Sequence, residues 1–122
     1  VERKMTILIV EKYYDPGKGF RDALEKTGYH TVSLSSHPAI FDVLAQQRLD
    51  MAIVGVATTT EFCESIMRQI KKANLKIPVI VVSAFKNVPG KEKLMELGVR
   101  EWMQQPFDMQ FFKRRVNELL NI

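Results

Sequence analysis

The sequence predicts a single α/β domain, residues 1–122, with a doubly wound, five-stranded parallel sheet. Short apolar runs alternate with segments whose apolar residues recur at helical spacing, which is typical of βαβ units. The chain has 122 residues, 46% of them hydrophobic, which is enough for one core. Right-handed crossovers place helices on both faces of the sheet, and we expect the strand order 2-1-3-4-5.

The first βαβ unit occupies the first third of the chain. Residues 5–10 (M-T-I-L-I-V) form a β-branched run that predicts the first strand. The D-P-G turn at residues 15–17 follows, and a helix runs from it to about Lys26, because proline fits a helix start. Gly28 closes this helix, and residues 31–34 form the second strand.

The middle of the chain repeats this alternation. Residues 38–47 carry apolar side chains at helical spacing and predict a second helix, and residues 51–56 predict the third strand. Thr58 and Glu61 have the S/T-x-x-E spacing of a capping box, which predicts the start of the third helix. The apolar residues behind this start recur at helical intervals: Phe62, Ile66, Met67 and Ile70.

The last third completes the sheet. Residues 78–82 (P-V-I-V-V) are a continuous apolar run, as expected for a strand buried on both faces. A helix at residues 91–97 ends at Gly98, and residues 101–103 form a brief fifth strand. The pattern after Pro106 predicts an amphipathic final helix. Its apolar residues are Phe107, Phe111, Phe112, Val116, Leu119 and Leu120.

Composition excludes several classes of protein. The net charge of +4, from 18 basic and 14 acidic residues, is too small an excess for a dedicated nucleic-acid surface. No apolar run approaches the roughly 18 residues of a membrane span, so we expect a cytosolic protein. Cys63 is a lone cysteine, which supports neither a disulfide nor a zinc site. Because the first residue is not Met and the last predicted helix runs to Ile122, we expect an excised piece of a longer protein.

In the predicted topology the functional crevice lies at the carboxyl ends of the strands. The residues there are Glu11, Lys12, Gly55, Ser83 and Gln105. This set has one carboxylate and neither histidine nor cysteine, so no catalytic pair forms and no enzyme is expected. Mg²⁺ wants one or two carboxylates plus substrate phosphates, and Lys12 puts a positive charge beside the only acid. We therefore expect neither metal nor cofactor.

Five segments carry a resemblance to a known family. They are residues 7–12 (I-L-I-V-E-K), the Gly-Tyr pair at 28–29, residues 50–55 (D-M-A-I-V-G), residues 77–84 (I-P-V-I-V-V-S-A) and residues 98–107. In this order and spacing the chain resembles, over nearly its whole length, the receiver domain of two-component response regulators. The resemblance implies a flavodoxin-like (βα)5 fold and a role in phosphorelay signalling.

The departures from that family are at the site itself. The resemblance implies that the phosphoryl group goes to an Asp that is Gly55 here, and that Mg²⁺ binds an acidic pair that is Glu11-Lys12 here. The Lys that steadies the phosphate is Gln105 here, and Asp50 lies at the opposite end of the third strand. We therefore expect a degenerate receiver, or pseudo-receiver, that is not phosphorylated on aspartate and binds no Mg²⁺.

Two interpretations are open for each of three residues. The Lys12 ammonium takes the place of the metal, pairing with Glu11 and Gln105, or it points to solvent. Ser83 matches the family's switch hydroxyl, or it caps a loop. Trp102 matches a rotating aromatic that switches or anchors an interface, or it is fixed core.

The leading functional hypothesis is regulation by protein contact, with an output domain of the same polypeptide, with a partner protein or through a homodimer. The resemblance implies that the homodimer uses the surface formed by the fourth helix, the fifth strand and the fifth helix. Here that surface has Trp102, Phe111, Lys113 and Arg114. The basic run at residues 113–115 is a solvated helix face or a contact for an acidic partner.

Two other hypotheses are weighed against it. A ligand-sensing pseudo-receiver would bind a small molecule or an anion in the vacated pocket near Gly55. An enzyme on the flavodoxin-like fold is weaker, because the strand ends lack catalytic pairs. No recognition helix follows a tight turn, so any DNA binding and transcription regulation would belong to an attached domain.

Overall fold

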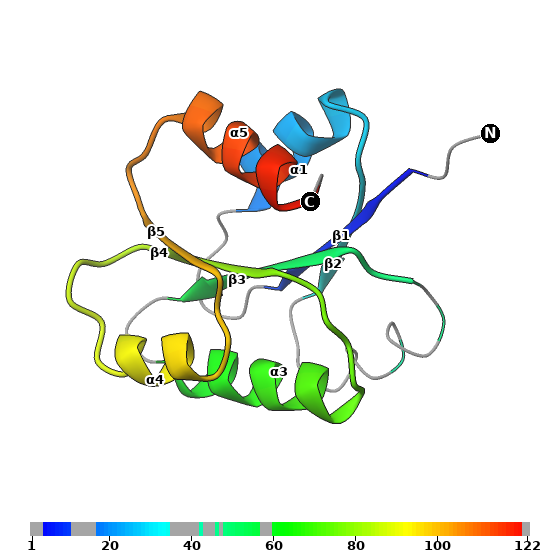
Figure 1. Cartoon of the computed structure of the whole chain (residues 1–122). Coiled ribbons are helices and arrows are strands. Elements are labelled where there is room, and N and C mark those ends of the chain that lie inside the picture. Colours follow the sequence, from blue (N-terminus) through cyan, green and yellow to red (C-terminus); the bar gives the residue numbers. More distant parts are fainter. Residues whose placement is uncertain are drawn as a thin grey trace.

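Five parallel strands form one sheet in the order β2-β1-β3-β4-β5, which confirms the predicted fold class and strand order (Figure 1). The computed structural model describes residues 4–10, 17–34, 42, 46, 48–56 and 60–120. The strands are β1 (Thr6–Val10), β2 (His30–Leu34), β3 (Met51–Val56), β4 (Val79–Ser83) and β5 (Glu101–Gln104). The helices are α1 (Gly17–Lys26), α3 (Glu61–Lys72), α4 (Lys91–Glu96) and α5 (Met109–Leu120).

The helices cover both faces of the sheet, with α1 and α5 on one face and α3 and α4 on the other (Figure 1). The residues of β1, β3 and β4 are all buried, which explains their continuous apolar runs. Successive side chains of each strand point into the two cores in turn. A shift of one residue would exchange the side chains between the cores, so burial specifies the register of these three strands.

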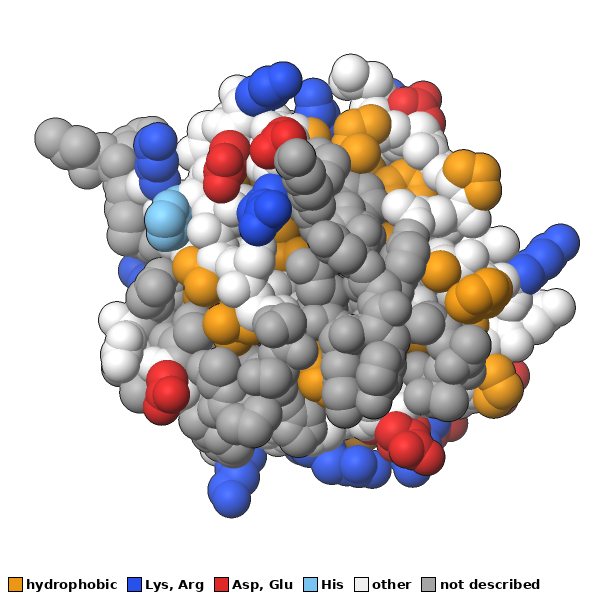
Figure 2. Space-filling view, turned by 180° about the vertical axis from the view of Figure 1, so that it is seen from behind, with side chains coloured by type: hydrophobic (Ala, Val, Ile, Leu, Met, Phe, Trp, Pro, Cys, Tyr) orange, Lys and Arg blue, Asp and Glu red, His pale blue; other side chains and the backbone are white. Residues whose placement is uncertain are grey.

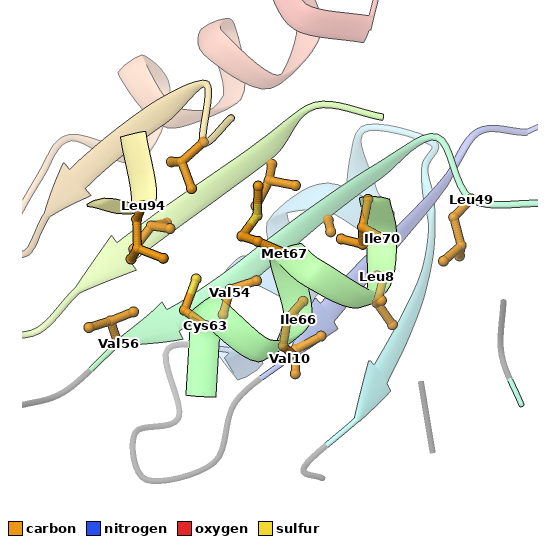
Figure 3. Packing of buried hydrophobic residues seen from close by; sticks show 14 of the residues in the cluster. Leu8, Val10, Leu49, Val54, Val56, Cys63, Ile66, Met67, Ile70 and Leu94 are labelled. Atoms are coloured by element: carbon orange, nitrogen blue, oxygen red, sulfur yellow. The ribbon is translucent and has the colours of Figure 1, made fainter. Parts of the chain in front are cut away.

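Each face of the sheet has its own hydrophobic core. Beneath α1 and α5 the fully buried side chains include Ile7, Ile9, Leu24, Ile53, Ile80, Phe112 and Val116. Beneath α3 and α4, Cys63, Ile66 and Met67 of α3 lie against Leu8 and Val54 of the sheet (Figure 3). The alternation of side chains along β1 explains why Ile7 and Leu8 belong to different cores.

Left-handed residues end three of the helices: Gly28 after α1, Asn74 after α3 and Gly98 after α4. Gly28 has φ 102° after α1, and the Tyr29 N–H donates to the Leu24 carbonyl at 3.1 Å. Asn74 has φ 56° after α3, and the Leu75 N–H donates to the Ile70 carbonyl at 3.1 Å. Both are helix C-terminal motifs that favour glycine or asparagine, so the stop predicted at Gly28 is confirmed.

The start of α3 corrects one prediction. The helix begins at Glu61, with Thr60 as the residue before it, so Glu61 is not at the third helical position that a capping box on Thr58 requires. Thr60 forms no side-chain cap bond, and its hydroxyl donates instead to the Pro89 carbonyl at 3.3 Å. A tertiary contact to the loop before α4 has replaced the local motif.

Asp108 starts the last helix. Its carboxylate accepts a hydrogen bond from the Gln110 N–H at 2.8 Å, and its carbonyl accepts one from the Phe112 N–H at 3.1 Å. This is an N-cap, and it explains why α5 begins at Met109 rather than directly after Pro106.

The predicted helix at residues 38–47 lies almost wholly outside the described residues. Of that range the structure describes Asp42 and Gln46, and both are helical. Within the described residues, no helix has the length and apolar character needed to cross a membrane.

Candidate functional site

Three of the five predicted site residues meet at the carboxyl edge of the sheet. Gly55 pairs with Val82, and Ser83 pairs with both Val56 and Gln104, so consecutive strands bring Gly55, Ser83 and Gln105 to the same edge. The Gln105 N–H donates to the Ser83 carbonyl at 2.9 Å, which continues the ladder past the end of β5. The parallel topology thus assembles these residues from segments far apart in the sequence.

The other two predicted site residues, Glu11 and Lys12, lie outside the described residues. The last residue of β1, Val10, pairs with Val54, so the described end of β1 lies beside the strand that carries Gly55. The predicted pairing of Lys12 with Glu11 and Gln105 therefore remains a prediction.

Gly55 is buried in β3 and has no side chain to offer at this edge. The nearest acid in the chain before it, Asp50, is fixed at the amino end of the same strand. Its carboxylate accepts a hydrogen bond from the Thr6 N–H at 2.8 Å, and its own N–H donates to the Thr6 carbonyl at 2.9 Å. Arg48 lies 4.0 Å from the same carboxylate. Asp50 therefore joins β3 to β1 and does not substitute for an acid at Gly55.

Ser83 is fully buried, and its hydroxyl is bound to the loop that follows its own strand. The hydroxyl donates to the Phe85 carbonyl at 2.6 Å, and the Phe85 N–H lies 3.3 Å from the same oxygen. This is the loop-capping arrangement, one of the two interpretations of Ser83.

Gln105 is half-buried, and its peptide bond to Pro106 is cis. An amide side chain has hydrogen-bonding capacity and no charge. Within the described part of the chain, no group of three or more His, Cys, Asp or Glu side chains is placed to hold a metal ion.

Trp102 is half-buried on β5 and packs against the core beneath α3 and α4. The Lys91 ammonium lies 5.4 Å from the centre of the Trp102 ring, within the range of a cation–π contact. The ring is thus held between the sheet and a lysine of α4. This arrangement is closer to the fixed-core interpretation than to a free aromatic platform.

The three basic residues at 113–115 have different surroundings in the structure. Arg115 bonds Glu101 of β5 at 2.7 Å and also Glu118, and these hydrogen bonds raise the pKa of Arg115 above its usual value. Arg114 is exposed and Lys113 is half-exposed. Arg115 therefore joins α5 to β5, and the prediction of a solvated face holds only for the other two residues.

Three large apolar side chains are exposed in the described part of the chain. Phe111 is 42% exposed on α5, as expected, but Met95 on α4 at 41% and Phe85 at 55% were not predicted. Hydrophobic side chains gather on the right-hand side of Figure 2, the side on which the β4–α4 loop and the start of α5 lie. Sequence pattern gave no signal for Phe85 and Met95, because single apolar residues in loops and short helices are common.

Comparison with known proteins identifies the family. The sequence model of the response regulator receiver domain matches residues 7–117. The chain belongs to this family, whose members are signalling modules of two-component systems, and the resemblance inferred from the sequence is confirmed.

The chain is similar to part of two longer curated proteins and to nearly the whole of a third. The uncharacterized transcriptional regulatory protein YbdJ of Bacillus subtilis is 29% identical over 93% of this chain, which spans only 50% of that protein. Histidine kinase P4 of Formosa agariphila is 30% identical over 98% of this chain, which spans 9% of that protein. Sporulation initiation phosphotransferase F of Bacillus subtilis is 23% identical, and the match covers 93% of this chain and 92% of that protein.

Solved structures agree on the fold. A response regulator receiver protein from Burkholderia phymatum has a TM-score of 0.78 at 23% identity, covering 98% of this chain and 97% of the other. A response regulator from Thermotoga maritima has a TM-score of 0.80 at 18% identity, covering 98% of this chain and 100% of the other.

Proposed function

We propose that this receiver domain signals through protein contact without phosphorylation of an aspartate, and that it has no enzymatic activity. Gly55 carries the proposal, because it stands at the position that the sequence resemblance assigns to the phosphoacceptor. A glycine has no side-chain oxygen that could attack a phosphoryl group. Asp50, the acid on the same segment, is bonded to Thr6 at the opposite end of the strand.

The neighbouring side chains support this proposal. Phosphoryl transfer depends on positioning a nucleophile and on cations that stabilise the charge on the transferred group. Gln105 supplies a neutral amide where the family has a lysine, and the Ser83 hydroxyl is already bonded to Phe85. The described edge therefore lacks both the nucleophile and the fixed positive charge.

The residues also fit Mg²⁺ poorly. The resemblance implies a Mg²⁺ ion at this edge, and Mg²⁺ prefers near-octahedral oxygen ligands with at least one carboxylate. Gly55 offers no side-chain ligand, and Lys12 in the sequence adds a positive charge beside Glu11. We propose that the domain works without this ion.

For the contact surface we propose the α4–β5–α5 face, defined here by Met95, Trp102, Phe111, Lys113 and Arg114. It combines two exposed apolar side chains with basic residues. A partly apolar patch rimmed by charge is typical of a protein interface. The proposed partner is a second copy of the domain, an attached output domain or a partner protein with a complementary surface.

Sedimentation velocity over a range of concentrations tests the homodimer. We expect association that the double charge reversal K113E/R114E weakens by about tenfold or more, because Lys113 and Arg114 can then no longer pair with acidic side chains of the second copy. The matched control is K71E/K72E, which makes the same change of charge on α3. A wild-type protein that stays monomeric at every concentration would contradict the homodimer.

The phosphate-independent part of the proposal has a separate test. Amide spectra recorded with Mg²⁺ and acetyl phosphate should match those recorded without them at Gly55, Ser83 and Gln105. Shifts at these residues that depend on both reagents would overturn it. The ligand-sensing alternative depends on Lys12, which lies outside the described residues, and it remains a prediction.

A further inference from the structure

A cavity of about 380 Å³, open to solvent, lies at the amino-terminal edge of the sheet, away from Gly55. Its walls come from the turn between α3 and β4, the turn between α4 and β5, and the C-terminal part of α5 (Figure 1). The lining residues are Lys76, Ile77, Pro78, Gly98, Arg100 and Leu119. We refer to this feature as the amino-edge groove.

Among the described residues, two cations line the amino-edge groove and no acidic residue does. Lys76 and Arg100 are both exposed, and neither has a carboxylate partner among the described residues. Arg115, by contrast, is neutralised by Glu101. Because the groove is partly walled by protein, the two positive charges act at a site less well screened than an open surface.

Three of the six residues that line the groove have apolar side chains. Ile77, Pro78 and Leu119 are half-buried, and Ile77 and Leu119 pack against the two cores on opposite faces of the sheet. The backbone beneath the cations is fixed, because the Arg100 N–H donates to the Val79 carbonyl at 2.9 Å. This bond joins the turn that carries Arg100 to the start of β4, which follows the turn that carries Lys76.

Other lysines near this edge of the sheet have a simpler role, which is to stabilise the end of a helix. Lysines near a helix C-terminus offset its partial negative charge, and Lys71 and Lys72 occupy this place in the last turn of α3. Lys76 and Arg100 lie beyond the helices, in the turns that lead into β4 and β5. Their convergence on one cavity calls for a different explanation.

We infer that the amino-edge groove binds a small organic anion, with a carboxylate or phosphate between Lys76 and Arg100 and an apolar body on Ile77, Pro78 and Leu119. A guanidinium offers paired donors that match either anion, and the ammonium adds a second charge. This site is separate from the carboxyl edge. The inference does not depend on whether the domain accepts a phosphoryl group.

Titration with phenyl phosphate, followed in ¹H–¹⁵N spectra, tests the inference. We expect saturable shifts at the amides of Lys76, Ile77, Gly98 and Arg100, with a dissociation constant on the order of 1 mM. Inorganic phosphate and benzyl alcohol, which supply the charge and the apolar body separately, should each bind more weakly. Phenylacetate distinguishes a carboxylate from a phosphate preference.

Variants locate the site. R100Q and K76Q should each weaken phenyl phosphate binding by about tenfold, because each removes a charged partner of the anion. K72Q removes an exposed charge from α3 outside the groove and should leave the affinity unchanged. Shifts that never saturate, or an affinity unaltered by R100Q in a protein whose spectrum shows an intact fold, would overturn the inference.

Discussion

The backbone N–H of Gln105 donates to the carbonyl of Ser83 at 2.9 Å, so the ends of β4 and β5 are joined beyond the last residue pair of the sheet. The same serine is bonded through its hydroxyl to Phe85. Ser83 thus connects the end of β4 to the residues that follow β4 and to those that follow β5. In this structure it has a structural role that needs no phosphate.

Ser83→Ala should therefore lower the free energy of unfolding by about 1 kcal/mol, because the Phe85 carbonyl loses its buried donor. Urea unfolding measures the change. Thr27→Ala is the matched control, since it removes a hydroxyl that bonds the Ala23 carbonyl at an exposed site. We expect the control to lose less than about 0.5 kcal/mol. Equal losses in the two variants would show that the Ser83 hydroxyl does not anchor the loop.

Gly90, directly before α4, should not tolerate a side chain. Its φ of 93° is strained for other residues, and an added Cβ would lie 2.1 Å from the Thr60 hydroxyl. We expect Gly90→Ala to destabilise the fold by more than about 1 kcal/mol. Gly28→Ala is the control, because its φ of 102° gives similar strain with nothing within 4 Å of the added Cβ.

Gly90→Ala should lower the free energy of unfolding more than Gly28→Ala does. The difference between the two losses measures the cost of the steric contact with Thr60. Adding Thr60→Ala to Gly90→Ala should restore part of the lost stability, because the nearest atom is then gone. Chemical denaturation of the wild type, Thr60→Ala, Gly90→Ala and the double variant provides the comparison, because Thr60→Ala alone removes the bond to Pro89. If the losses of the two single variants simply add in the double variant, backbone strain alone explains the effect of Gly90→Ala.

Cys63 should be inert to thiol reagents in the folded protein. Burial, with the charge of Glu64 as a smaller cause, raises its pKa to about 12. The thiol therefore stays protonated at pH 8, and it reacts only when α3 opens. We expect labelling by Ellman's reagent to be slower by about a hundredfold or more than in the urea-unfolded chain. Rapid labelling of the native protein would contradict this burial.

The same pKa predicts a dependence of stability on pH. The folded-state value lies above the ordinary 9.0, so the folded state favours the neutral thiol. This contribution is complete below pH 9 and is lost as the pH rises toward 12. Between these limits the wild type should lose stability relative to Cys63→Ala. Parallel pH curves for the two proteins would contradict the raised pKa.

The fold was predictable because the three central strands, β1, β3 and β4, are almost entirely apolar and the helices between the strands are amphipathic. Gly28 and Gly98 also marked helix ends correctly, since a left-handed residue is a local requirement. The start of α3 was not predictable in this way. Thr60 bonds Pro89, a residue far along the chain, and local spacing contains no trace of that contact.

The candidate site was predictable only in part. Residues at strand ends converge by topology alone, so Gly55, Ser83 and Gln105 were found without coordinates. The cation–π contact of Lys91 with Trp102 and the bond of Arg115 to Glu101 join separate elements, and nothing in their spacing indicates them. The amino-edge groove was missed for the same reason, because Lys76 and Arg100 belong to different turns.

Intact mass after incubation with acetyl phosphate and Mg²⁺ tests the central claim most directly, run beside a phosphorylatable receiver as a positive control. We expect no added mass on this chain while the control gains a phosphoryl group, because Gly55 has no side-chain oxygen to accept one. A stoichiometric, acid-labile adduct would contradict the proposal, and peptide mapping of that adduct would identify the residue that replaces Gly55.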